Sequence, residues 1–328
     1  MRAVRRILVA IKNPSARSLP AVDKAVQLAR AFGARLELFH AIASHVYTDF
    51  ELTDEKLDEL KQSRLVQCRA RLEAIAERAH KAKVPVHTAV EWDYPPHEAI
   101  VRQAGRVRAD LIVAECHAGR RVAPLLLHLT DWELLRYSPV PVLLVKSKKP
   151  YRNPVVLAAV DPTHANAKPT QLDDEILKAA VTVRAAMRGS LHAVHAFVPL
   201  PFDAKPSELL DEHAAERLEE RARTAARGRL DKALGKKVRL PRGNRHLLGR
   251  HPVNAIPELA RKIHSDIVVM GAISRTGIKR FFIGNTAERI VDDLTCDVLV
   301  VKPREFASRV ERKSRGVRLV SPPLPMPY

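Results

Sequence analysis

Three glycines, Gly271, Gly277 and Gly284, stand close together in a sequence stretch that could bind an anion. The stretch follows an apolar run, 266–270, and precedes a helical pattern over 287–294. Glycine reaches backbone conformations that other residues avoid and lets a ligand approach the main chain. The start of a helix adds unpaired N–H groups and the positive end of its dipole. A strand, a glycine-bearing loop and a helix in this order predict a phosphate site.

Other reactive side chains give weaker patterns. Cys116 and His117 are neighbours at a strand end, but adjacent residues on a strand point to opposite faces, so a thiolate–imidazole pair is not expected. His192 and His195 share a predicted strand and also face opposite sides, which argues against a joint metal site. No P-loop motif is present. Since no base, nucleophile or metal cage is assembled, we do not expect a turnover enzyme.

Composition limits the class of protein. A length of 328 residues suits two domains, and the longest apolar runs, such as 140–145, are far too short to span a bilayer. Three widely spaced cysteines favour a reducing cytoplasm over a disulfide framework. The net charge of +19 would attract nucleic acid, but aromatic residues make up only 5%, so no base-stacking surface is evident. We expect a cytoplasmic protein without a transmembrane segment, for which nucleic acid is an alternative partner.

Strand and helix patterns alternate along the chain. Apolar runs bounded by turn residues predict strands, and apolar positions with a helical period predict helices. Strands are expected at 6–12, 35–41, 84–90, 109–114, 141–145, 155–160, 191–197, 245–248, 266–270 and 297–301. Helices are expected at 21–32, 53–83, 97–106, 171–187, 207–234 and 254–263, with a short one opened by a capping box at Thr130.

The same order occurs twice because the sequence contains an internal repeat. After subtraction of 156, positions 252–302 superpose on 96–146 without a gap. Such a match indicates duplication. Alternating strands and helices imply a mainly parallel sheet covered on both faces, with ligands at the carboxyl ends of the strands. Identical pairs include Pro252/Pro96, Ala255/Ala99, Ile256/Ile100, Asp266/Asp110, Thr286/Thr130 and Lys302/Lys146.

The repeat sets the expected domain boundaries. We predict a first domain over 1–149 and a second over 150–305, joined by a linker at 147–154. A basic, proline-rich tail, 306–328, follows the second domain, and its composition predicts an extended or disordered segment.

Three stretches resemble the universal stress protein family in its tandem, two-domain form. They are the opening strand 7–11, the stretch 130–136 and the loop that runs from Gly271 to Glu288. The resemblance covers roughly residues 5–305. It implies two Rossmann-like domains, each a mainly parallel five-stranded sheet with helices on both faces.

The resemblance also implies a nucleotide site in the second domain. ATP-binding members of the family carry a Gly-x-x-Gly-x9-Gly-Ser/Thr loop and an acidic residue at the end of the first strand, beside the ribose or adenine. The implied ligand is ATP, with Mg²⁺, and no catalytic or metal-ligating side chain is expected. The nucleotide-binding residues implied in this sequence are Val160, Asp161, Met270, Gly271, Ser274, Arg275, Gly277, Gly284, Asn285 and Thr286.

Two of these positions depart from the family pattern. Ser274 stands where the second glycine is expected, and its Cβ takes up room and restricts the backbone. Asn285 stands where the serine is expected and would cap the following helix with the N–H groups that a phosphate would use. Arg275, by contrast, offers charge that would offset a phosphate.

The first domain has lost the pattern. Glu115, Ala118 and His128 occupy the positions of the loop residues, and Lys12 replaces the acidic residue after the first strand. Because a carboxylate at the mouth of a phosphate site opposes binding, we expect a degenerate structural or regulatory half.

The resulting expectation is a stress-response regulator or protectant with ATP binding in its second domain. Slow ATP hydrolysis is left open. One alternative is a scaffold that binds no nucleotide, whose halves pack together like the dimer of single-domain relatives. Another is a basic stress factor associated with nucleic acid. A homodimer is compatible with each of these.

Overall fold

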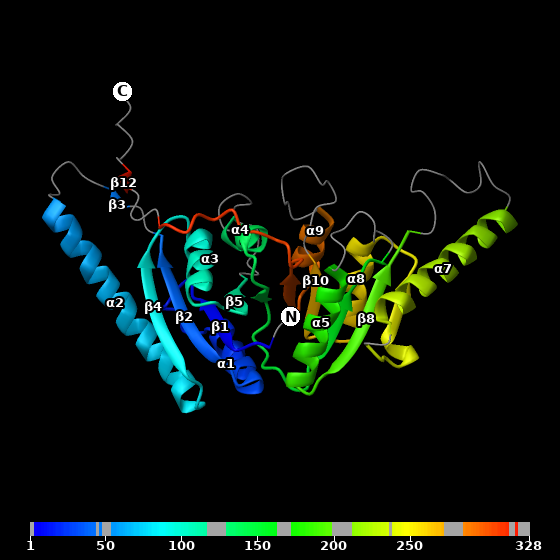
Figure 1. Cartoon of the computed structure of the whole chain (residues 1–328), viewed down its shortest axis with the longest axis horizontal. Helices are drawn as coiled ribbons and strands as arrows, with labels where there is room; N and C mark the ends of the chain where they lie inside the picture. The colour runs from blue at the N-terminus through cyan, green and yellow to red at the C-terminus, as the bar shows by residue number, and fades with distance from the viewer. Residues whose placement is uncertain are drawn as a thin grey trace, which may run out of the picture. The chain divides into compact units, whose positions relative to one another are not determined.

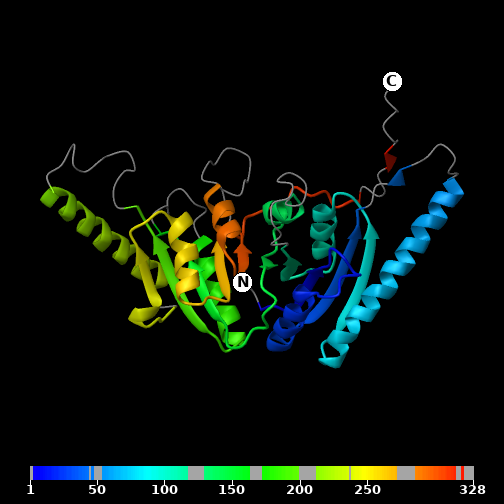
Figure 2. The same ribbon diagram turned by 180° about the vertical axis from the view of Figure 1, so that it is seen from behind.

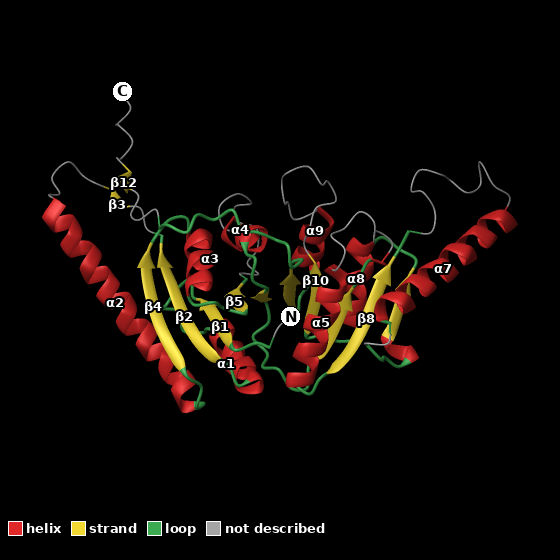
Figure 3. Ribbon diagram, in the orientation of Figure 1, coloured by secondary structure: helices red, strands yellow, loops and turns green. Residues whose placement is uncertain are grey.

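Strands and helices alternate along the chain, and the order occurs twice in the computed structural model (Figure 1). Helices flank the strands of both repeats (Figure 3). The predicted fold class is thereby confirmed: two Rossmann-like α/β repeats with mainly parallel strands. The structure describes residues 3–43, 46–47, 54–116, 129–162, 172–198, 212–235, 238–271, 285–314 and 319–320.

The first repeat begins with β1 and ends with β6. Its elements are β1 (Arg6–Ala10), α1 (Pro20–Phe32), β2 (Arg35–Ile42), β3 (Val46–Tyr47), α2 (Asp54–Lys81), β4 (Val86–Trp92), α3 (Pro96–Arg106), β5 (Leu111–Glu115), α4 (Leu129–Tyr137) and β6 (Val142–Val145). The order agrees with the sequence prediction. One local expectation is wrong: α4 begins at Leu129, so Thr130 lies in its first turn and does not cap it.

The second repeat has the same order, followed by a short C-terminal strand. Its elements are β7 (Val155–Ala159), α5 (Leu172–Ala186), β8 (Ser190–Ala196), α7 (Glu212–Leu234), a 3-10 turn (Arg242–Asn244), β9 (Arg245–Leu248), α8 (Pro252–Lys262), β10 (Ile267–Gly271), α9 (Asn285–Asp293), β11 (Asp297–Val301) and β12 (Leu319–Val320).

Packing divides the chain into two units. The first comprises Arg2–Val142 together with Ala307–Tyr328, and the second comprises Leu143–Phe306. The C-terminal segment therefore belongs with the first unit, where β12 pairs in parallel with β3. The domain boundary at 149/150 follows the sequence repeat instead of the packing and stays a prediction.

Parallel strands form the centre of each unit. The order is β4-β2-β1-β5 in the first and β11-β10-β7-β8-β9 in the second. In the first unit α1 contacts α2 and α3 contacts α4, and right-handed crossovers place these pairs on opposite faces of the sheet. The front and back views both show α2 running alongside β4 (Figures 1 and 2). Strand order reverses between β1 and β5, and between β7 and β10, where ligands bind in such sheets.

The sequence specifies α1 through its ends and its buried stripe. Pro20 occupies the first turn, where its missing N–H costs nothing. Val22, Ala25 and Leu28 are among the residues that bury one face against the sheet. Gly33 ends the helix at a φ of 65°, a left-handed conformation that favours glycine.

A matched pair of aspartates ties the first strand of each repeat to its neighbour. Asp110 Oδ2 accepts the backbone N–H groups of Arg5 and Arg6 at 2.9 and 3.0 Å. In the second repeat, Asp266 Oδ2 accepts the N–H of Val155 at 2.9 Å. These carboxylates satisfy main-chain donors at the amino ends of β1 and β7, which explains the same residue at both positions.

The segment that follows β6 is held by a buried carboxylate in the second unit. Asp297 Oδ1 accepts the N–H groups of Lys146 and Ser147 at 2.9 and 3.0 Å, and Oδ2 accepts the Tyr151 hydroxyl at 2.5 Å. The Lys146 ammonium in turn donates to the carbonyls of Val291, at 2.5 Å, and Leu294. These carbonyls lie at the C-terminal end of α9, where a cation interacts favourably with the helix dipole.

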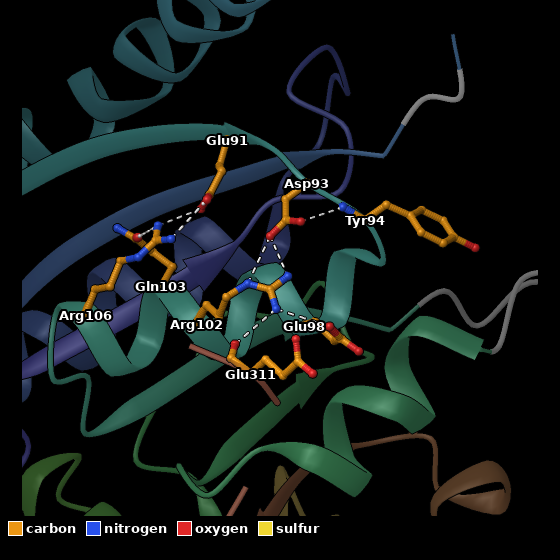
Figure 4. Close-up of polar contacts among 8 residues, drawn as sticks. All are labelled: Glu91, Asp93, Tyr94, Glu98, Arg102, Gln103, Arg106 and Glu311. Carbon is orange, nitrogen blue, oxygen red and sulfur yellow. Dashed lines mark hydrogen bonds and ion pairs between the residues drawn. The ribbon is translucent and has the colours of Figure 1, made fainter. Parts of the chain in front are cut away.

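The C-terminal segment contacts α3 through a buried arginine (Figure 4). Arg102 donates to Asp93 at 3.0 and 2.5 Å and to Glu98 at 3.1 Å. It also donates to the Glu311 carbonyl at 3.3 Å. Because the side chains of Arg102 and Asp93 are 1% and 0% exposed, each partner offsets a substantial desolvation cost. Residues 306–314, predicted from composition to be extended or disordered, thus have defined contacts in this structure.

The Tyr151–Asp297 contact predicts instability at alkaline pH. Burial and the neighbouring carboxylate raise the pKa of Tyr151 well above its usual value. The unfolded chain loses this proton at about pH 10, while the folded chain keeps it, so stability falls as pH rises above that value. We expect Tyr151→Phe to cost about 1–3 kcal/mol near neutrality, because Asp297 loses a hydrogen bond.

Urea unfolding of both proteins between pH 8 and 11 would measure this effect. The wild type should lose stability more steeply than Tyr151→Phe above pH 10. Parallel pH profiles would contradict the assignment.

Candidate functional site

The carboxyl end of β7 carries two of the predicted site residues. Val160 is buried, and its N–H donates to the Val194 carbonyl at 3.0 Å. Asp161 is half-buried, and its backbone N–H donates to Asp173 Oδ1 at 3.1 Å, in the first turn of α5. The Asp161 backbone is therefore fixed where the strand meets the helix.

The other described strand end is that of β10. Met270 is buried, and Gly271 is the last residue of the strand. Since β10 pairs in parallel with β7, with Val269 opposite Ala158, both strands end at the same edge of the sheet. Asp161 and Gly271 therefore share the position where the strand order reverses, as the repeat pattern predicts.

Gly271 also has a packing role. A Cβ added there would come within 2.6 Å of Leu172 Cδ2 and 2.9 Å of Leu172 Cγ. Leu172 is buried at the start of α5, so it has little room to move. The glycine is thus needed for close approach of a side chain, a reason that the loop pattern in the sequence did not reveal.

The remaining predicted residues belong to the loop and the following helix. Ser274, Arg275, Gly277 and Gly284 lie outside the described residues. Asn285 is the first residue of α9, and Thr286 is half-buried in its first turn, which also contains Glu288. The structure therefore brings Asp161 and Gly271 to one edge of the sheet and places the start of a helix at 285, as expected for the second repeat.

The corresponding place in the first repeat holds an ion pair. Lys12 Nζ lies 2.5 Å from Asp131 Oδ1, although the contact lacks hydrogen-bond geometry. Lys12 follows β1 as Asp161 follows β7, and Asp131 lies in the first turn of α4. The chain thus supplies its own anion near this helix N-terminus and its own cation to neutralise it. Sequence comparison identified Lys12 but missed its partner.

A histidine near the same edge was also missed. His40 Nδ1 lies 2.8 Å from the Ile11 carbonyl, directly before Lys12. Burial lowers the pKa of His40, while the carbonyl contact raises it and the charge of Arg64 lowers it. The lowered pKa favours neutral imidazole here, so the charge in this region comes from Lys12 and Asp131.

The residues considered for covalent or metal chemistry are not assembled into a site in the described part of the chain. Cys116 is half-buried after β5, and His117 lies outside the described residues. Within the described ranges, no group of three or more His, Cys, Asp or Glu side chains converges as a metal cage would. Among those same residues, no helix is long and apolar enough to cross a membrane.

Comparison with known proteins identifies relatives over almost the whole chain. The model of the universal stress protein family matches residues 3–146 and again 155–302. Universal stress protein E of Salmonella typhi is 31% identical over 329 residues, covering 95% of this chain and 98% of its own length. Universal stress protein E of Escherichia coli K12 is 29% identical over 324 residues, with the same coverage.

A solved structure shows the same arrangement of elements. A putative universal stress protein from Pseudomonas aeruginosa UCBPP-PA14 superposes with a TM-score of 0.69 at 25% identity, covering 92% of this chain and 95% of its own. The tandem form expected from the sequence is confirmed by the two matched segments.

The packing role of Gly271 predicts a local, rescuable cost. Gly271→Ala should lower the free energy of unfolding by about 1–3 kcal/mol, because the new methyl group meets Leu172. In a Leu172→Ala background the same change should cost much less, since the obstructing side chain is gone. A double-mutant cycle by urea unfolding measures the coupling, and additive costs would contradict this role.

The Lys12–Asp131 pair predicts a second coupling. Lys12→Met leaves the Asp131 carboxylate, which is only 7% exposed, without its cation, and should cost about 1–3 kcal/mol of stability. Lys12→Met with Asp131→Asn should recover most of the loss, because the uncompensated charge is removed. Equal stability of the single and double variants in urea unfolding would show that the pair contributes nothing.

Proposed function

Because the chain belongs to the universal stress protein family, we propose that its second repeat binds ATP at the shared carboxyl ends of β7 and β10. The proposed contacts are Asp161 with the ribose or adenine, and the 271–286 loop with the phosphates, accompanied by Mg²⁺. Val160, Met270, Gly271 and Thr286 would line the site. We further propose a cytoplasmic role as a stress-response regulator or protectant.

One observation carries this proposal: the two repeats differ in charge at matching positions. The first repeat has Lys12 after its first strand and Asp131 in its helix, 2.5 Å apart. The second has Asp161 and Ala287 at these positions, so the same internal ion pair cannot form. The start of α9 thus lacks that built-in anion, and a phosphate would supply the negative charge that a helix N-terminus favours.

The described residues fit a nucleotide in part. A carboxylate after the first strand suits hydroxyl or amino groups of a nucleoside, and the edge where β7 and β10 end is the usual ligand position in this type of sheet. Leu172 packs over Gly271 and would form an apolar wall beside it. The proposal therefore assigns recognition of the nucleoside to Asp161 and of the phosphates to the loop and α9.

Thermal unfolding with and without Mg-ATP tests the proposal. ATP at about 100 times its dissociation constant should raise the free energy of unfolding by about 2.7 kcal/mol. Asp161→Lys, which copies the charge of the first repeat, should abolish the increase. The matched control, Lys12→Met, should keep the full ATP-dependent increase even though the protein starts less stable.

Two outcomes would overturn the proposal. No stabilisation by millimolar ATP would favour a scaffold that binds no nucleotide. Stabilisation that survives Asp161→Lys but disappears in Lys12→Met would assign the nucleotide to the first repeat.

A further inference from the structure

Two histidine rings face each other on neighbouring strands of the second unit. His192 lies on β8 and His246 on β9, and their ring centroids are 5.3 Å apart with an angle of 14° between the planes. His192 Nδ1 is 3.0 Å from His246 Nε2. Both side chains are half-buried, and β9 ends the order of strands, so the pair lies beside a sheet edge. Neither residue belongs to the proposed nucleotide site.

The same place in the first repeat holds a pair of different chemistry. Glu37, like His192, is the third residue of its strand, and its Oε2 lies 2.9 Å from His87 Nδ1. Its other oxygen accepts the Gln103 side chain at 2.8 Å. In the second repeat Leu259 stands at the position of Gln103. The carboxylate is thus held by two polar partners, whereas the second repeat replaces it with an imidazole and removes the amide.

The distance between the two nitrogen atoms fits a shared metal ion. With metal–nitrogen bonds of about 2.0–2.1 Å, atoms 3.0 Å apart subtend about 91–97° at the ion. This angle is close to the 90° between neighbouring ligands in square-planar or octahedral coordination and smaller than the tetrahedral angle. Copper(II) and nickel(II) with nitrogen ligands adopt tetragonal geometry.

We propose that His192 and His246 chelate a divalent transition-metal ion, Cu²⁺ most tightly and Ni²⁺ next, with water completing the coordination. The two strands supply the ligands already separated by the required distance, so little rearrangement opposes binding. Zn²⁺, which prefers tetrahedral angles, binds less tightly at this pair.

The local electrostatics act in two directions. Burial lowers the pKa of both imidazoles, and the charges of His192 and Lys262 lower that of His246 further. The neutral rings are the form that binds metal near pH 7. The Lys262 ammonium also repels a cation, so Lys262→Gln should tighten binding.

Copper titration of the full chain at pH 7 tests this site. Electron paramagnetic resonance of the first equivalent of Cu²⁺ should show two equatorial histidine nitrogens. His192→Gln and His246→Gln should each weaken the first binding event by more than about tenfold, since even the loss of an outer-shell partner costs 10–100-fold. The matched control is His87→Gln, at the corresponding pair of the first repeat, and it should leave the first event unchanged.

The chain has 14 histidines, so weak binding elsewhere is the background against which the first equivalent is compared. Urea unfolding of each variant shows whether it is folded, and Lys262→Gln provides a gain of affinity that misfolding cannot mimic. The proposal is overturned if the first equivalent binds equally well in wild type and both histidine variants, or if Cu²⁺ does not bind. In either case the His192–His246 contact serves only to hold β9.

Discussion

A single buried carboxylate determines how the second repeat begins. Asp297 accepts two backbone N–H groups and a tyrosine hydroxyl from the segment 146–151, which leads from β6 to β7. That arrangement leaves the Lys146 ammonium at the last carbonyls of α9. The far end of the same helix is the proposed phosphate position. The geometry of the candidate site thus depends on a charge that is completely buried at the opposite end of the helix.

Duplication preserved the scaffold and changed its charges. Asp110 and Asp266 perform the same main-chain task in both repeats, because every parallel sheet of this kind must satisfy the donors at its amino ends. The positions at the carboxyl ends carry no such obligation. There the first repeat carries Lys12, paired with Asp131, and the second carries Asp161, so one half satisfies its own helix end and the other can receive a ligand.

The sequence predicts the order of elements, the repeat and the strand ends that carry Asp161 and Gly271, because these follow from local patterns of apolar residues. It does not predict contacts that depend on register or on how helices lie over the sheet. His192 was correctly separated from His195, but its partner His246 follows from the pairing of β8 with β9. The packing of Leu172 over Gly271 and the partner of Lys12 likewise join residues far apart in the sequence.

The return of the C-terminal segment to α3 affects the order in which the molecule is made. Arg102 emerges from the ribosome early, whereas Glu311, which accepts one of its hydrogen bonds, is synthesised only after the second repeat. Domains generally fold as units during synthesis, beginning at the N-terminus. The first unit therefore assembles its strands while one donor of a buried guanidinium still relies on water, and it acquires its final native contact only when translation is nearly complete.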